Sequence, residues 1–184
     1  MGAKEVTLIL EVVNARHGPE ANLGENWPGT DGHDHLVDPA SLVSYLDYEE
    51  VGHPPGVPTT DELEELRELA LVGRAVRTDE PVRLARRLEP ILARYTFRLS
   101  PDGSLIPTAG GWRGFAAQAA RGLVELTSQR DRLSFCANPA CDWLFLDESR
   151  NHTRQWCSMG SCGSRAKMAR YRSRKRGPSE QRPT

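Results

Sequence analysis

The chain has 184 residues, 38% of them hydrophobic and 27% charged, which is enough for one ordinary domain or for one domain with a small module. Residues 1–135 carry 14 Lys and Arg against 21 Asp and Glu, whereas residues 136–184 carry 10 against 4, so the basic end favours a polyanionic partner or a solubilising tail. No apolar run is long enough for a membrane span and the start does not resemble a signal peptide, so we expect a cytoplasmic protein.

The elements expected before the cysteine region are mainly helical. Residues 6–13 form a buried strand or begin a helix, because periodicity does not decide for so short a run. Residues 17–39 are expected to form a loop, and Ser41 to cap a short helix that ends at Tyr48. Apolar residues at helical spacing predict three further helices: one that starts at Thr60 or Asp61 and reaches Val76, one from Pro81 to about Tyr95, and one from about Trp112 to Leu126.

Short β elements are expected between and after these helices. The turn residues Pro101-Asp102-Gly103 predict one hairpin. Residues 132–136 and 143–147 are candidate strands around the first cysteines. The fold class expected is mainly α with small β elements (α+β). We place a helical domain at residues 1–130, a cysteine module with a basic helix at 131–177, and a disordered tail at 178–184.

All four cysteines lie within one short segment, with the spacing Cys136-x4-Cys141-x15-Cys157-x4-Cys162. Two close pairs separated by a loop of this length are typical of a tetrahedral zinc site, and four thiolates leave no position open for catalysis. A module of about 40 residues seldom buries enough apolar surface to fold without a bound metal ion or another cross-link. The spacing therefore predicts one structural Zn(II) ion.

Other interpretations of the cysteines stay open at this point. Two disulfides would need an oxidising compartment, which nothing in the sequence indicates. Four buried free cysteines would make their clustering a coincidence. If zinc is bound, the four thiolates leave a formal charge of about −2, and Arg150, Arg154 and Arg165 are close enough in sequence to compensate it.

The cysteine region resembles the CGNR-type zinc finger, a bacterial module. The resemblance rests on Cys162-Gly163-Ser164-Arg165, with Ser164 where the family has Asn, and on the surrounding residues Phe145, Asp147, Ser149, Asn151, Trp156, Cys157, Ser158, Met159, Lys167, Tyr171 and Arg172. It implies zinc binding by the four cysteines and DNA binding by the finger. The Ser164 departure puts in doubt whatever contact the family's Asn makes.

The region before the module is similar to the ABATE domain, the usual companion of this finger, which is described as a candidate stress-induced transcription regulator. The similarity lies in its length, its helical character and its early apolar run ending at Asn14. It implies a domain that senses a small-molecule effector or forms a homodimer.

The segment from Arg165 to Arg176 is strongly basic. Lys and Arg neutralise phosphates and release counterions, and an all-round basic helix can lie in a groove with phosphates on both sides. We expect Met168 and Tyr171 to face inward. The alternative is a solvated helix that compensates the zinc site. The residues predicted to contact DNA are Arg165, Lys167, Arg170, Arg172, Arg174, Lys175 and Arg176.

The prediction is a zinc-containing DNA-binding transcriptional regulator without enzymatic activity. A protein–protein adaptor, in which zinc is purely structural and the basic helix meets an acidic partner, is the alternative. An enzyme in the N-terminal domain is the third hypothesis, although no nucleophile–base pair or phosphate-binding loop is visible. Asn14 and Arg16 could line a ligand pocket or cap an element. The cluster at 31–38, with His33 and His35, is a second metal site or a solvated loop.

Overall fold

The computed structural model describes residues 3–16, 34–138 and 141–175, and it confirms a mainly helical fold with two small antiparallel strand pairs. The elements in chain order are α1 (Ala3–Asn14), α2 (Pro39–Tyr48), α3 (Thr60–Ala75), α4 (Pro81–Leu92), β1 (Phe97–Leu99), β2 (Leu105–Pro107), α5 (Gly111–Ser128), a short 3-10 turn (Arg130–Arg132), β3 (Leu133–Phe135), β4 (Leu144–Leu146), a π-helical turn (Met159–Gly163) and α6 (Ser164–Lys175).

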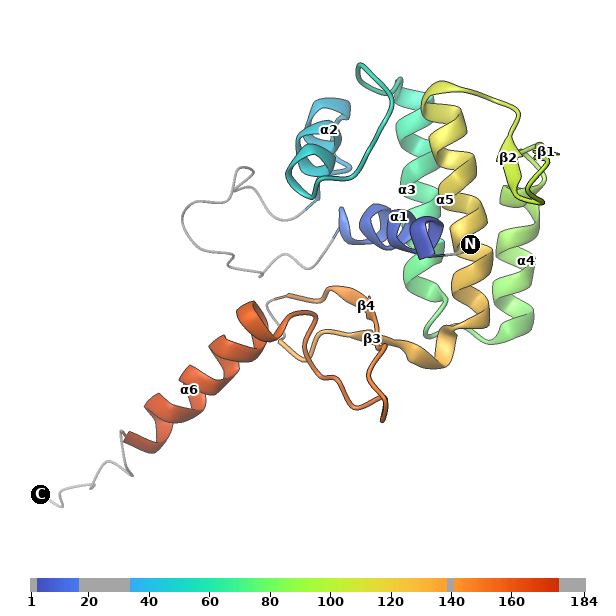
Figure 1. Cartoon of the computed structure of the whole chain (residues 1–184). Helices are drawn as coiled ribbons and strands as arrows, with labels where there is room; N and C mark the ends of the chain where they lie inside the picture. Colours follow the sequence, from blue (N-terminus) through green and yellow to red (C-terminus); the bar gives the residue numbers. More distant parts are fainter. Residues whose placement is uncertain (1–2, 17–33, 139–140, 176–184) are drawn as a thin grey trace, which may run out of the picture.

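The central element is α1, which crosses α3 and α5 (Figure 1). The first apolar run is therefore helical, and Ile9, Val12 and Val13 are fully buried. Two glycines allow the close approach: a Cβ atom at Gly122 would overlap the carbonyl oxygen of Glu5, and one at Gly73 would overlap the side chain of Val13. These glycines explain why a short helix can occupy the centre of the core.

The helix starts follow ordinary capping chemistry, with one difference from expectation. Asp38, and not Ser41, is the N-cap of α2, because its carboxylate accepts from the backbone N–H groups of residues 40 and 41. Thr59 and Glu62 form a reciprocal capping box at the start of α3. The fourth helix ends at Leu92, earlier than the predicted Tyr95.

The hairpin predicted around residues 101–103 is confirmed. Strand β1 pairs with β2, with Arg98 opposite Ile106, and Gly103 takes a φ of +81° in the turn. Positive φ is a conformation that glycine adopts without steric cost.

The second hairpin joins the cysteine region to the helical core. Strand β3 pairs with β4, with Ser134 opposite Phe145. Leu133 and Leu144 are fully buried in the same apolar cluster as α1, α3 and α5. The module thus shares a core with the helices, in addition to its own small cluster around Phe145 and the cysteines.

The last helix, α6, extends away from the rest of the molecule (Figure 1). Among its described residues none is buried. The expectation that Met168 and Tyr171 face inward is wrong: they are 50% and 57% exposed, because α6 lies against no apolar surface that could cover them.

Candidate metal centre

Four backbone segments bring the cysteines together. Cys136 follows β3, Cys141 precedes β4, Cys157 precedes the π-helical turn and Cys162 lies within that turn. The β3–β4 hairpin fixes the first pair, since the N–H of Cys136 donates to the carbonyl of Trp143 over 2.9 Å. A turn in which the N–H of Cys141 donates to the carbonyl of Asn138 then aims the second sulfur at the same point.

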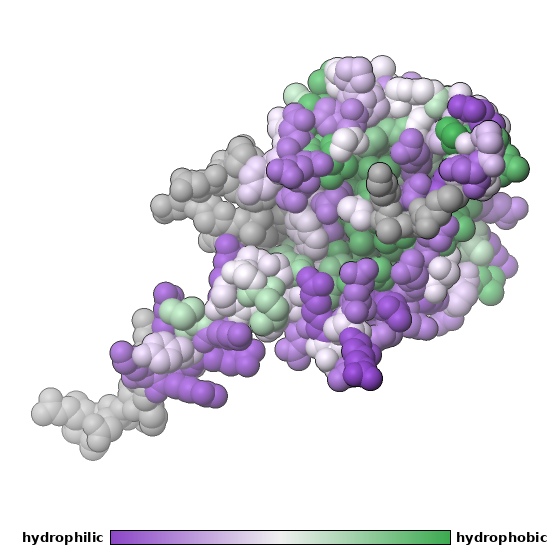
Figure 2. Space-filling model, in the orientation of Figure 1, coloured by the Kyte–Doolittle hydropathy of each residue, from purple (hydrophilic) through white to green (hydrophobic). Residues whose placement is uncertain are grey.

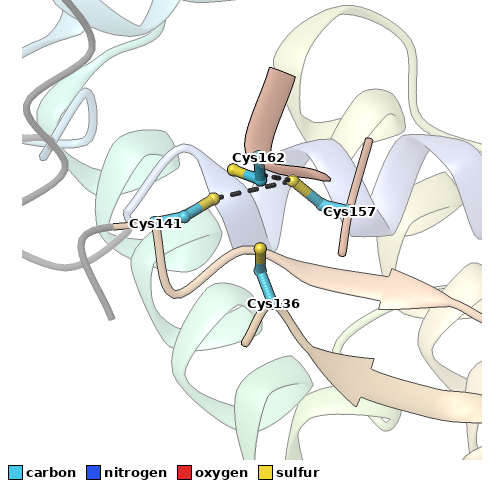
Figure 3. A group of neighbouring side chains, drawn as sticks. All are labelled: Cys136, Cys141, Cys157 and Cys162. Carbon is cyan, nitrogen blue, oxygen red and sulfur yellow. Dashed lines mark hydrogen bonds between the residues drawn. The ribbon is translucent and has the colours of Figure 1, made fainter. Parts of the chain in front are cut away.

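The sulfur atoms form a compact group, and all four Sγ atoms lie within 4.8 Å of one another (Figure 3). The Sγ–Sγ distance is 3.6 Å between Cys141 and Cys157 and 3.8 Å between Cys157 and Cys162. Zn–S bonds of about 2.3 Å in tetrahedral geometry place sulfurs about 3.8 Å apart. The group therefore fits one structural zinc ion held by Cys136, Cys141, Cys157 and Cys162.

The competing interpretations of the cysteines do not fit this geometry. All four are free, and their separations far exceed the disulfide bond length of about 2.05 Å. Three of them are buried, and the fourth, Cys157, is partly exposed. When zinc is bound at such a site, it contributes folding free energy to a module with a small core.

The thiols influence one another's ionisation. A hydrogen bond from the thiol of Cys157 lowers the pKa of Cys141 to about 6, and burial opposes this effect. The pKa of Cys157 is raised, first by that same hydrogen bond and then by burial. Burial also raises the pKa of Cys136. Among these three thiols, the surrounding groups favour the thiolate form only at Cys141, and the thiolate is the form that binds a metal.

Backbone and side-chain donors around the sulfurs hold the site in shape. The side-chain amide of Asn138 donates to Cys162 Sγ over 3.5 Å. The N–H of Gly163 donates to the carbonyl of Ser158, and a Cβ at Gly163 would lie 3.0 Å from the sulfur of Met159. The hydroxyl of Ser164 donates to the carbonyls of Gly160 and Ser161, so this residue fastens the start of α6 to the preceding turn.

One of the three nearby arginines is built into the module. The guanidinium of Arg154 donates to the backbone carbonyls of Trp156 and Cys157 and lies 4.8 Å from the centre of the Phe145 ring. The carboxylate of Asp147 accepts from the N–H of Arg154, which fixes the loop between the pairs. Arg150 and Arg165 are exposed.

Two polar contacts connect the module to the helical body, and sequence reasoning missed both. The fully buried Asn14 donates to the carbonyl of Leu144 and accepts from its N–H, each over 2.8 Å. Arg74 of α3 donates to the carbonyl and carboxylate of Asp142, and its guanidinium lies 5.0 Å from the centre of the Phe135 ring. The position of Asn14 directly after an apolar run indicated a polar contact at this point, but the sequence did not reveal Leu144 as the partner.

The predicted DNA contacts lie together on the exposed α6, apart from Arg176, which falls outside the described residues. Six basic residues point outward from this helix, and its sequence contains no acidic residue: Arg165, Lys167, Arg170, Arg172, Arg174 and Lys175. In the space-filling view this part of the molecule is largely hydrophilic (Figure 2). The structure therefore presents these six charges on one projecting element.

The other candidate site is not assembled in the part of the chain that the structure describes. His35 is buried and stacks on Tyr45 at 4.7 Å between ring centres, Asp34 pairs with Arg16, and Asp38 caps α2. Asp31 and His33 lie outside the described residues. Asn14 and Arg16 thus make contacts between elements: Asn14 bonds to Leu144, and Arg16 pairs with Asp34.

Comparison with known families assigns the C-terminal part of the chain. Residues 132–175 match the CGNR zinc finger, which covers β3, β4, all four cysteines and α6. The zinc-finger part of the resemblance is thereby confirmed. No curated protein matches the chain. None of the described helices combines the length and apolar character needed to cross a membrane.

Proposed function

We propose that this chain is a zinc-containing DNA-binding protein that regulates transcription, with α6 as the element that contacts duplex DNA. The observation that carries the proposal is a projecting helix with six basic residues and no buried side chain, attached directly to the metal centre. Twelve helical residues span about 18 Å, and the major groove of B-DNA is wide enough to admit a helix.

In this proposal the zinc centre orients α6. Cys162 lies in the turn that leads into α6, and Ser164 fastens the first residue of the helix to that turn. Bound zinc would thus fix the direction in which α6 leaves the module. The arginines would contact phosphate chiefly, which gives affinity without strong sequence preference.

The N-terminal region has a regulatory part in the same proposal. Residues 1–130 would be an ABATE-like domain that senses an effector or forms a homodimer, and residues 131–177 would be the DNA-binding unit. The proposed role is binding and regulation in the cytoplasm, without a catalysed reaction.

A protein–protein adaptor is the second candidate. Met159, Met168 and Tyr171 are each about half exposed on or beside α6, and Met, Tyr and Arg are enriched at protein interfaces. In this case α6 would meet an acidic protein surface instead of phosphates.

The test is binding of the zinc-loaded chain to random-sequence duplex DNA across a salt series. Six phosphate contacts would give a log–log slope of up to about −5. Absence of binding even at low salt would overturn the DNA proposal and favour the adaptor.

A further inference from the structure

A cavity of about 520 Å³ lies between the helical body and the zinc module. Its walls come from α1, the end of α5, and β4 with the residues beside it. Pockets that bind small ligands commonly have volumes of about 300–1,000 Å³ and often lie at interfaces between structural units. The size and place of this cavity therefore suit a small ligand.

One side of the cavity is apolar and aromatic. Val6 and Leu10 of α1 face it from the helical body, and Trp143, Phe145 and Leu146 face it from the module. Val6 and Phe145 are almost fully buried, so these walls are fixed by the core. Such walls suit the hydrocarbon or aromatic part of a ligand.

The charge of the cavity is of one sign. Three carboxylates line it, Glu11, Glu125 and Glu148, and the described lining contains no Lys or Arg. The hydroxyl of Tyr45 donates to Glu11 over 2.8 Å and fixes that carboxylate. Burial raises the pKa of Glu11 to about 7, a cost that a neighbouring cation would offset.

Glu11 also borders a second cavity, of about 710 Å³, which shares Thr7 and Glu11 of α1 with the first. Its described lining adds Glu5, Glu49 and Glu50 and again contains no basic residue. One oxygen of Glu5 is buried without a hydrogen-bond partner among the described residues. The other oxygen of Glu5 pairs with Arg121 over 2.7 Å, so part of the negative charge of the second cavity is already compensated. The aromatic side chains line the first cavity, which therefore suits a ligand better.

We infer that the cavity between α1, α5 and β4 binds an organic cation, an amine or guanidinium that carries an apolar arm. The cationic group lies among Glu11, Glu125 and Glu148, and the arm lies against Val6, Leu10 and Trp143. In this placement the carboxylates attract the cationic group by ion pairing, and the apolar walls remove the arm from water. Neither an anion nor a purely apolar molecule satisfies both sets of groups.

A ligand in this cavity would touch both parts of the molecule at once. Leu144 lines the cavity and is the residue whose backbone pairs with Asn14 of α1, while Trp143 closely follows the zinc ligand Cys141. Binding is therefore expected to stabilise the attachment of the module to the body. This inference goes beyond the proposed function and does not depend on DNA binding.

The test compares three ligands with the same arm: 3-phenylpropylamine, 3-phenylpropanol and 3-phenylpropanoate. Each is titrated into the zinc-loaded full chain and followed by two-dimensional NMR of the backbone amides and the Trp143 indole. We expect the amine to bind about fivefold more tightly than the alcohol, with shifts confined to α1, α5 and β4, and the carboxylate not to bind.

A double variant tests the charges without disturbing the core. Glu125 and Glu148 are exposed, so Glu125→Gln with Glu148→Gln should fold and should weaken amine binding about fivefold. Glu89→Gln, at an exposed position of α4, is the matched control and should leave binding unchanged. Equal binding of amine and alcohol, shifts away from the cavity, or an unaffected double variant would each overturn the inference.

Discussion

The side-chain amide of Asn14, the last residue of α1, pairs with both backbone groups of Leu144 through two hydrogen bonds of 2.8 Å. The amide thus occupies the outer edge of β4, where a neighbouring strand would otherwise pair. A buried backbone edge must find hydrogen-bond partners, and Asn offers one donor and one acceptor in the required geometry. This pair connects the zinc module to the centre of the helical core.

Replacing Asn14 should therefore be costly. Asn14→Ala leaves the N–H and C=O of Leu144 buried without these partners, and we expect a loss of about 2–4 kcal/mol in the free energy of unfolding. Urea denaturation of the zinc-loaded protein measures it. Asn151→Ala, at an exposed position of the module, is the control and should change stability by less than about 0.5 kcal/mol. Equal stabilities for both variants would contradict the assigned role.

Removal of one sulfur ligand should separate metal binding from the helical fold. Cys162→Ser is expected to lower bound zinc from about one ion per chain to well below it, as measured by elemental analysis after purification under reducing conditions. The helical signal in the far-ultraviolet circular dichroism of the variant should persist, because the packing of α1, α3 and α5 does not include Cys162. A wild-type protein without stoichiometric metal would refute the zinc assignment.

The contact between Arg74 and Asp142 should hold the first cysteine turn against α3. Arg74→Met keeps an apolar stem beside Phe135 but removes the hydrogen bonds to Asp142. Relative to the wild type, we expect the rate of amide exchange to rise around residues 141–144 and to change less in α5. Arg77→Met, at an exposed position of the same chain region, serves as control. Unchanged exchange around residue 142 would show that the turn is held by other contacts.

Burial of Glu11 should make stability depend on pH. Its pKa rises from 4.5 to about 7, chiefly through burial, with the hydrogen bond from Tyr45 opposing and Glu49 adding to the rise. The folded state therefore keeps a proton that the unfolded state releases, and stability present below about pH 4.5 is lost as the pH rises through about 7.

Glu11→Gln removes this ionisation. We expect it to be more stable than the wild type above pH 7, by on the order of 1–3 kcal/mol, and the difference to shrink towards about pH 5. Urea denaturation of both proteins across this range measures the difference in their free energies of unfolding at each pH. The contributions of other titrating groups cancel, because both proteins contain them. A difference that stays constant with pH would contradict the raised pKa.

Charge reversal on α6 tests the DNA contacts directly. Arg170→Glu with Arg172→Glu should weaken duplex binding and lower the magnitude of the salt slope by about 0.9 for each phosphate that the helix no longer neutralises, while zinc content stays near one per chain. Arg86→Glu with Arg98→Glu reverses two exposed charges outside the module and should retain most of the binding. Release of zinc from the α6 variant would instead mean that these arginines serve the fold.

Local patterns in the sequence predicted the metal centre and most helices, because their causes lie close together in the chain. The two cysteine pairs, the turn at Pro101–Gly103 and the start at Pro81 each depend on a few neighbouring residues. The contacts that place the module could not be predicted in this way. Asn14 and Leu144 are 130 residues apart, and Arg74 and Asp142 are 68 apart.

Two further differences have clear physical reasons. Periodicity left the short run at residues 6–13 open between strand and helix, and it is a helix because Gly73 and Gly122 make room for one against α3 and α5. The apolar character of Met168 and Tyr171 predicts inward positions, because apolar residues on helices usually pack against a core. On α6 they are exposed, because hydrophobicity cannot bury a side chain where no other element lies.

The attachment of α6 through the single turn at Met159–Gly163 makes the helix a lever. For a rod of about 18 Å, a tilt of about 10° at the turn moves the far end by about 3 Å. Small changes in sulfur positions would therefore be amplified along the helix and would shift its terminal cations by a large part of the spacing between neighbouring phosphates. The positions of the basic side chains on α6 therefore depend on the geometry of the metal site at its start.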